Sequence, residues 1–134
     1  MDAIDTNILV YAFDLGYPKK REVCGKIISG IFSGNKSAAI TNQILAEFSF
    51  IVTAKIEKPL SKKDAAAIVG SILSSSNWNV INYTGDNVLN ALNSAEPFWD
   101  ALIIQTLKAN NVSRIITENA KDFKNSLEAI NPLL

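Results

Sequence analysis

The stretch Ala3-Ile4-Asp5-Thr6-Asn7-Ile8-Leu9-Val10-Tyr11 opens the chain and sets the pattern that decides its fold. Its first residues have the composition of the end of a short buried strand, and residues 6–13 are predicted to form a short helix. Asp5 lies at the junction between the two, where a carboxylate is costly to bury without a partner. A strand that ends in a polar residue and leads into a helix is typical of an α/β protein.

The same alternation continues through the rest of the chain. Further helices are predicted over residues 21–32, 42–56, 62–74, 86–94 and 97–109, and further strands over 37–40, 79–82, 114–117 and 127–130. This order predicts a central, mainly parallel sheet, and right-handed crossovers place helices on both of its faces. Since no linker or repeat divides the sequence, we expect a single domain over residues 1–134.

The composition excludes several kinds of chemistry. Thirteen acidic and thirteen basic residues balance, so net charge does not direct the protein to nucleic acid or to a membrane surface. The absence of histidine excludes Ser-His-Asp and Cys-His catalysis and histidine-bound zinc. A single cysteine, Cys24, is typical of a reducing cytoplasm, and we expect no membrane span and no signal peptide. Carboxylates, hydroxyls, lysines and metal ions remain for catalysis.

Four acidic residues lie within or beside apolar stretches: Asp5, Glu47, Asp100 and Asp122. Each has an ordinary explanation as a helix cap, an edge residue, a first-turn acid or a solvated turn residue. However, Asp5 and the segment 117–122 both follow predicted strands, and parallel sheets bind ligands beyond the carboxyl ends of their strands. Converging carboxylates repel one another unless a cation lies among them, and oxygen ligands favour Mg²⁺ or Mn²⁺. The pattern therefore predicts an acidic metal site.

Aromatic and basic residues offer weaker indications. Tyr11, Tyr17 and Trp99 are candidates for stacking on bases, although for Trp99 we expect packing in the core. Basic residues that line an RNA path or simply lie on solvated helix faces are Lys19, Lys20, Arg21, Lys55, Lys58, Lys62 and Lys63.

Four segments of the chain resemble the PIN domain family, especially the VapC-type toxins of VapBC toxin–antitoxin pairs. They are residues 4–14, 41–48, 98–103 and 115–123, of which Asp5-Thr6-Asn7 and Trp99-Asp100-Ala101-Leu102-Ile103 are the more specific. The resemblance implies a three-layer α/β/α sandwich and Mg²⁺- or Mn²⁺-dependent endoribonuclease activity on single-stranded RNA in the cytoplasm. It also implies inhibition by a cognate antitoxin and a homodimer.

The resemblance also implies roles for particular residues. It makes Asp5, Glu47, Asp100 and Asp122 the catalytic acids, with Asp5, Asp100 and Asp122 as metal ligands. Many relatives have an aspartate where this chain has Asn119, and others keep asparagine there with an aspartate three residues later. Asp122 is accordingly the expected fourth acid. Thr6, Asn7 and Asn119 resemble the family's supporting groups, which bond the ligands or their waters.

Two other functions fit the same residues. A catalytically impaired PIN-fold module would only dimerise or bind a partner, and a housekeeping RNA-processing nuclease would use the same site on other RNAs. A phosphatase with an aspartyl nucleophile would need an Asp-x-Asp pair, whereas Asp2 and Asp5 lie three residues apart.

Overall fold

The computed structural model describes residues 1–134 and contains a five-stranded sheet in which every neighbouring pair is parallel. Its strands are β1 Asp2–Ile4, β2 Ala38–Thr41, β3 Trp78–Ile81, β4 Arg114–Ile116 and β5 Glu128–Ile130. They lie in the order β3-β2-β1-β4-β5, so β1 is central and β4 is its direct neighbour. The predicted parallel sheet is confirmed, and the carboxyl ends of β1 and β4 meet at one edge.

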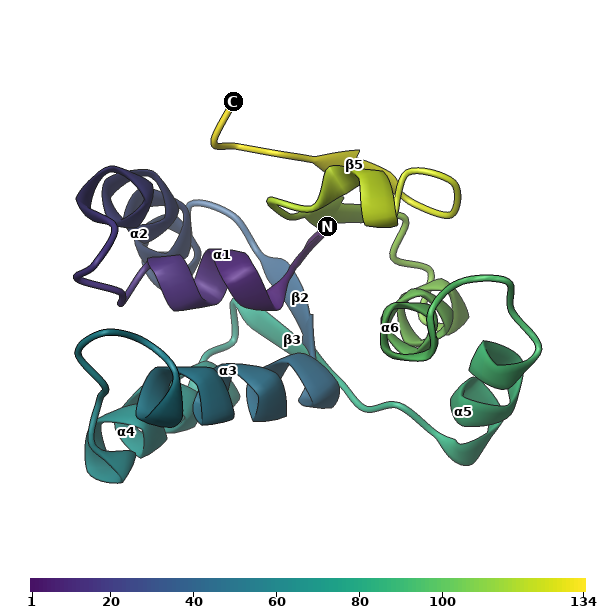
Figure 1. The fold of residues 1–134 in the computed structure, drawn as a ribbon, viewed down its shortest axis with the longest axis horizontal. Coiled ribbons are helices and arrows are strands. Elements are labelled where there is room, and N and C mark those ends of the chain that lie inside the picture. The colour runs from purple at the N-terminus through teal and green to yellow at the C-terminus, as the bar shows by residue number, and fades with distance from the viewer.

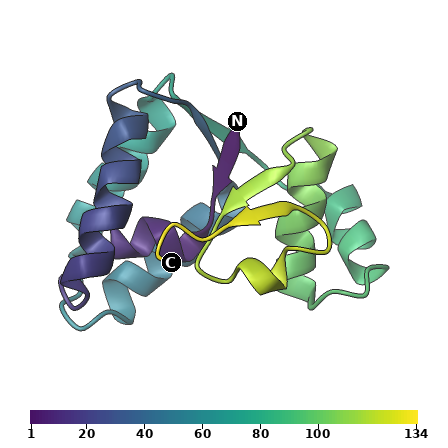
Figure 2. The ribbon, with the colours of Figure 1, turned by 90° about the horizontal axis from the view of Figure 1, so that it is seen from above.

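Helices cover both faces of this sheet. They are α1 Thr6–Tyr11, α2 Pro18–Phe32, α3 Asn42–Ala54, α4 Lys62–Ser74, α5 Gly85–Leu92, α6 Phe98–Ala109 and a 3₁₀ helix, η1, Ala120–Asp122. Helices α1 to α4 gather on one side of the strands, and α5 and α6 gather on the other (Figures 1 and 2). The three layers are those predicted from the sequence.

Local sequence explains where the helices begin. The side chains of Thr41, Ser61 and Thr84 each accept a hydrogen bond from a backbone N–H in the first turn of the helix that follows. Helix α2 begins at Pro18, three residues earlier than predicted, because proline suits the first helical position and does not break the chain there. It ends before Gly34, which has φ +85°.

The apolar core lies between the sheet and its helices. Residues 38–40 of β2 and the β1 residues Ala3 and Ile4 are buried, as are Phe48 of α3 and Leu107 of α6, which pack against the strands from helices. This packing fixes the starts of α1, α3 and α6 beside the carboxyl edge of the sheet. None of the helices has the length and apolar character that a membrane crossing requires.

Candidate active site

Asp5 follows β1 directly and is the most buried of the predicted site acids, with 6% of its surface exposed. Its Oδ1 accepts a hydrogen bond from the backbone N–H of Thr6 at 2.8 Å. Asp5 is therefore the N-cap of α1, the ordinary role considered for it from the sequence. Its Oδ2 accepts from the Thr117 hydroxyl at 2.7 Å and from the Asn7 amide at 3.4 Å. Capping therefore occupies one oxygen, while polar side chains hold the other in a fixed direction.

The structure adds Thr117 to the site. From the sequence, this residue was expected at the end of a strand and was assigned no role. It is fully buried just beyond β4, and its hydroxyl oxygen also accepts from the backbone N–H of Asn119 at 3.0 Å. Asn7 joins the same network, because its Oδ1 accepts from the backbone N–H of Glu118 at 3.1 Å. The signal that could have found Thr117 is its position directly after the strand that neighbours β1.

Glu47 lies half-buried on α3, and its Oε1 accepts a hydrogen bond from the Thr6 hydroxyl at 3.1 Å. Burial raises the pKa of its carboxyl above the ordinary range, and the negative charges of Asp5 and Asp100 add to the rise. The bond from Thr6 opposes that shift. Thr6, the residue that follows Asp5, therefore positions Glu47, and the charge of Asp5 acts on the pKa of Glu47.

Asp100 lies in the first turn of α6, half-buried, on the opposite layer of helices from Glu47. Burial raises its pKa, and repulsion from Asp122, Asp5 and Glu96 raises it further. The fold therefore brings acids from both helical layers to the end of β1.

The fourth acid is arranged differently from the other three. Asp122 is exposed at the end of η1, yet its charge contributes to the raised pKa values of Asp5 and Asp100. Asn119, also exposed, lines the cavity that contains the other acids, and Asp122 does not.

These residues surround an open cavity of about 640 Å³. Six of the seven predicted site residues line it: Asp5, Thr6, Asn7, Glu47, Asp100 and Asn119. For Asp5 the rise in pKa comes first from burial and is opposed by the bonds from Thr117 and Thr6. A divalent cation would oppose these shifts, because its positive charge stabilises the charged form of each carboxylate.

The donor set fits a hard divalent cation, since it consists of carboxylate, hydroxyl and amide oxygens. No three acidic side chains are grouped so tightly that all could hold one ion directly. Mg²⁺ commonly binds through one or two carboxylates and keeps several waters, so this spacing suits it. Asp5 is the best placed direct ligand because its hydrogen bonds already orient it.

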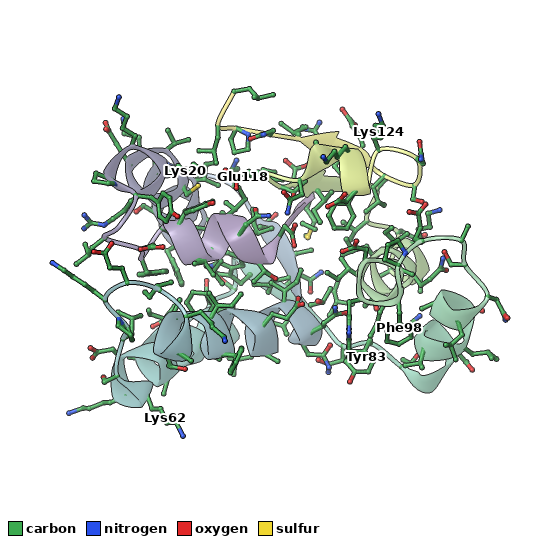
Figure 3. All side chains as sticks on the ribbon, viewed as in Figure 1. Lys20, Lys62, Tyr83, Phe98, Glu118 and Lys124 are labelled. Carbon is green, nitrogen blue, oxygen red and sulfur yellow. The ribbon has the colours of Figure 1, made fainter.

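An ion pair lies beside Tyr11, one of the residues that line the cavity. The Lys20 ammonium lies 2.6 Å from Glu118 Oε2, and the Tyr11 hydroxyl donates to Glu118 Oε1 at 2.8 Å. Figure 3 shows Lys20 and Glu118 side by side next to α2. Burial acts to raise the pKa of Glu118, but the bonds from Lys20 and Tyr11 prevail and lower it. Lys20 is thereby paired within the protein, and of the predicted basic residues only Lys55 lines the cavity.

None of the aromatic candidates is fully buried, although the half-buried Tyr11 packs against the core. Tyr11 and Tyr17 both line the cavity, with their rings in edge contact at 5.4 Å between centroids. Trp99 has 62% of its surface exposed, so the expectation that it packs in the core is wrong. The first turn of α6 points Asp100 toward the cavity and leaves the adjacent Trp99 at the surface.

The same fold occurs in solved toxin–antitoxin structures. A chain of a toxin–antitoxin complex from Klebsiella pneumoniae superposes with a TM-score of 0.67 at 19% identity, covering 98% of each chain. A chain of VapBC2 from Rickettsia felis, bound to a fragment of its promoter DNA, gives 0.62 at 22% identity over 96% of each chain. Mycobacterium tuberculosis VapC20, described as a toxin that cleaves the sarcin–ricin loop, gives 0.62 at 14% identity over 86% of this chain and 87% of its own.

At these identities the likeness establishes the fold alone, and the predicted PIN-like α/β/α sandwich is confirmed. No family model and no curated protein matches the sequence.

Proposed function

We propose that this protein is a metal-dependent endoribonuclease that cleaves single-stranded RNA and acts as the toxin of a toxin–antitoxin pair. The observation that carries the proposal is the convergence of Asp5, Glu47 and Asp100 on one cavity at the carboxyl edge of the sheet, where burial first and repulsion between acids second raise their pKa values. An arrangement that raises the pKa values of three acids is costly unless a cation or a proton compensates it. The fold, shared with solved toxin structures, supports the toxin assignment.

In this proposal Asp5, Asp100 and Asp122 would hold Mg²⁺ or Mn²⁺, with Asn119 as a neutral oxygen ligand or a holder of bound water. A bound ion would supply positive charge beside the phosphodiester and lower the pKa of a water molecule. Thr117 and the N–H of Thr6 orient Asp5 and favour its charged form. Asp122 lies outside the cavity lining, so we assign it contact through water.

Glu47 is proposed to accept the proton of the attacking water. Its pKa is raised toward the range in which a carboxylate takes up a proton effectively, and the Thr6 hydroxyl holds one of its oxygens. The attacking oxygen then bonds to phosphorus while the bond from phosphorus to the leaving oxygen breaks, and the leaving oxygen takes up a proton from solvent.

We further propose a cytoplasmic homodimer that is silenced by a cognate antitoxin. The support is that structures with this fold include toxin–antitoxin complexes. The impaired binding module and the housekeeping nuclease remain alternatives, and metal-dependent cleavage separates the first from an active enzyme.

The test is cleavage of a mixed single-stranded RNA pool with Mg²⁺, Mn²⁺ or EDTA. We expect cleavage in both metals, none in EDTA and none by Asp5→Asn or Asp100→Asn, with about a 10²–10⁴-fold loss for Glu47→Gln. Asp86→Asn is the matched control, because it removes an exposed first-turn acid of α5 outside the cavity. No cleavage by folded, partner-free protein, or equal cleavage in EDTA, would refute the proposal.

A further inference from the structure

A second groove of about 520 Å³ opens beside the acidic cavity. Glu47 lines both, so the two hollows adjoin at this residue. Three aromatic residues line the groove and are exposed: Phe50 by 59%, Tyr83 by 40% and Trp99 by 62%. Single exposed apolar residues are ordinary, whereas three aromatic side chains in one groove are typical of a binding surface.

Two contacts position Trp99, one to its backbone and one to its ring. Its backbone carbonyl accepts a hydrogen bond from the Gln43 amide at 3.1 Å, which ties the start of α6 to the start of α3. The neighbouring Phe98 ring contacts it edge-on at 5.0 Å between centroids. Figure 3 shows Phe98 and Tyr83 on the same side of the molecule. A large aromatic surface is thus presented to solvent on a fixed support.

The groove also contains side-chain amide atoms that have no hydrogen-bond partner within the protein. Asn42 Oδ1 accepts from the backbone N–H groups of Gln43 and Tyr83, both at 3.0 Å, which fixes the amide and leaves its Nδ2 without an acceptor in the protein. Gln43 is 6% exposed, and its Oε1 is buried without a donor. A buried acceptor of this kind usually has a partner, and Gln43 Oε1 has none within the protein.

We infer that this groove binds one nucleobase of the RNA strand whose phosphodiester lies in the acidic cavity. The base stacks on Trp99, and its polar edge accepts a hydrogen bond from Asn42 Nδ2. An aromatic surface next to an amide donor suits a base, which presents a π face and a polar edge together. This inference rests on the proposed function and adds a site that selects the base beside the cleaved bond.

The inference is tested by binding of single-stranded RNA octamers of each base to the Asp5→Asn protein with Mg²⁺ present. Adding Trp99→Ala is expected to weaken binding about five- to 150-fold, the usual range for loss of one stacked base. Trp99→Phe, which keeps an aromatic face, is expected to restore most of the affinity. Asn42→Ala is expected to change the ratio of affinities among the four octamers. Leu92→Ala is the control, because it removes a 67% exposed side chain outside the groove.

Tryptophan fluorescence gives a readout independent of cleavage. Bound RNA is expected to quench the emission of exposed Trp99, whereas Trp78, 4% exposed, is expected to be unaffected in the Trp99→Ala protein. Unchanged RNA affinity and cleavage in Trp99→Ala would overturn this inference and leave the nuclease intact. If Trp99→Ala instead weakens only self-association in sedimentation, the groove binds a second copy and the inference is also overturned. A wild type that cleaves no RNA would remove the proposed function itself.

Discussion

Removing the hydrogen bond from Thr117 to Asp5 tests whether this contact sets the protonation of Asp5 as well as stabilising the fold. Thr117→Val keeps the shape of a fully buried side chain and removes the hydroxyl that donates to Asp5 Oδ2 at 2.7 Å. A hydrogen bond to a charged group contributes about 1.5–3 kcal/mol to stability. With an unfolding entropy of about 2.1 cal/mol/K per residue over 134 residues, that loss lowers Tm by about 5–10 °C.

The same substitution changes the pH dependence of activity in a direction fixed by its cause. The Thr117 hydroxyl lowers the pKa of Asp5 against the effect of burial, so its removal raises that pKa further. A larger fraction of Asp5 is then protonated at a given pH and unable to bind a cation. We expect the acidic limb of the pH–rate profile, and the onset of Mg²⁺-induced stabilisation, to move to higher pH.

Thr106→Val is the matched control for this experiment. Thr106 is also fully buried, and its hydroxyl donates to the Leu102 carbonyl at 2.7 Å, within helix α6. It is expected to cost at most about 1 kcal/mol and to leave the pH–rate profile unchanged. Thermal unfolding and RNA cleavage from acidic to alkaline pH measure both effects. Equal losses of Tm in the two variants, with neither profile displaced, would refute the reasoning about Asp5.

Three further predictions use other features of the structure. The pKa values of Asp5, Glu47 and Asp100 are raised in the folded protein. The contribution of these carboxyl groups to the stability of the folded state is therefore complete below their ordinary pKa values of 3.8 and 4.5. It is lost as the pH rises through the folded pKa values. Metal-free protein should therefore lose stability in thermal unfolding as the pH rises above 4.5, and Mg²⁺ should restore more Tm at pH 8 than at pH 5. Gly34→Ala should cost about 1 kcal/mol in denaturant unfolding because φ is +85°, whereas Gly25→Ala, with open space around its helical position, should gain about 0.5–1 kcal/mol. The pKa of Tyr11 is raised first by burial and then by its bond to Glu118, so Glu118→Gln should lower it in a phenolate absorbance titration that Tyr11→Phe assigns.

The sequence predicted the order of strands and helices because apolar periodicity and capping residues are local. Lys62–Ser74 begins and ends as predicted, since Ser61 accepts from the Asp64 N–H within the same turn. The start of α2 was misplaced because proline both breaks and begins helices, and the surrounding structure decides which. Three of the four acids were brought together as expected because each follows or faces the carboxyl end of β1.

Contacts between distant segments were not predictable from one sequence. Nothing local to Thr117 indicates that its hydroxyl meets Asp5, because that meeting depends on β4 lying beside β1. The ion pair between Lys20 and Glu118 could not be predicted either, because it also joins segments far apart in the sequence. Trp99 was expected inside because large aromatic residues are usually buried, but the turn of α6 that directs Asp100 to the cavity leaves its neighbour outside.

The separation of Asp5 and Thr117 along the chain has a consequence for the timing of synthesis. Their hydrogen bond joins residues 112 positions apart, through strands that are neighbours in the sheet. A ribosome that has translated the first hundred residues has made Asp5, Glu47 and Asp100, but the strand that orients Asp5 does not yet exist. Prematurely terminated chains would therefore carry these three acids without an assembled site, and under the proposed function we expect such fragments to be inactive as nucleases.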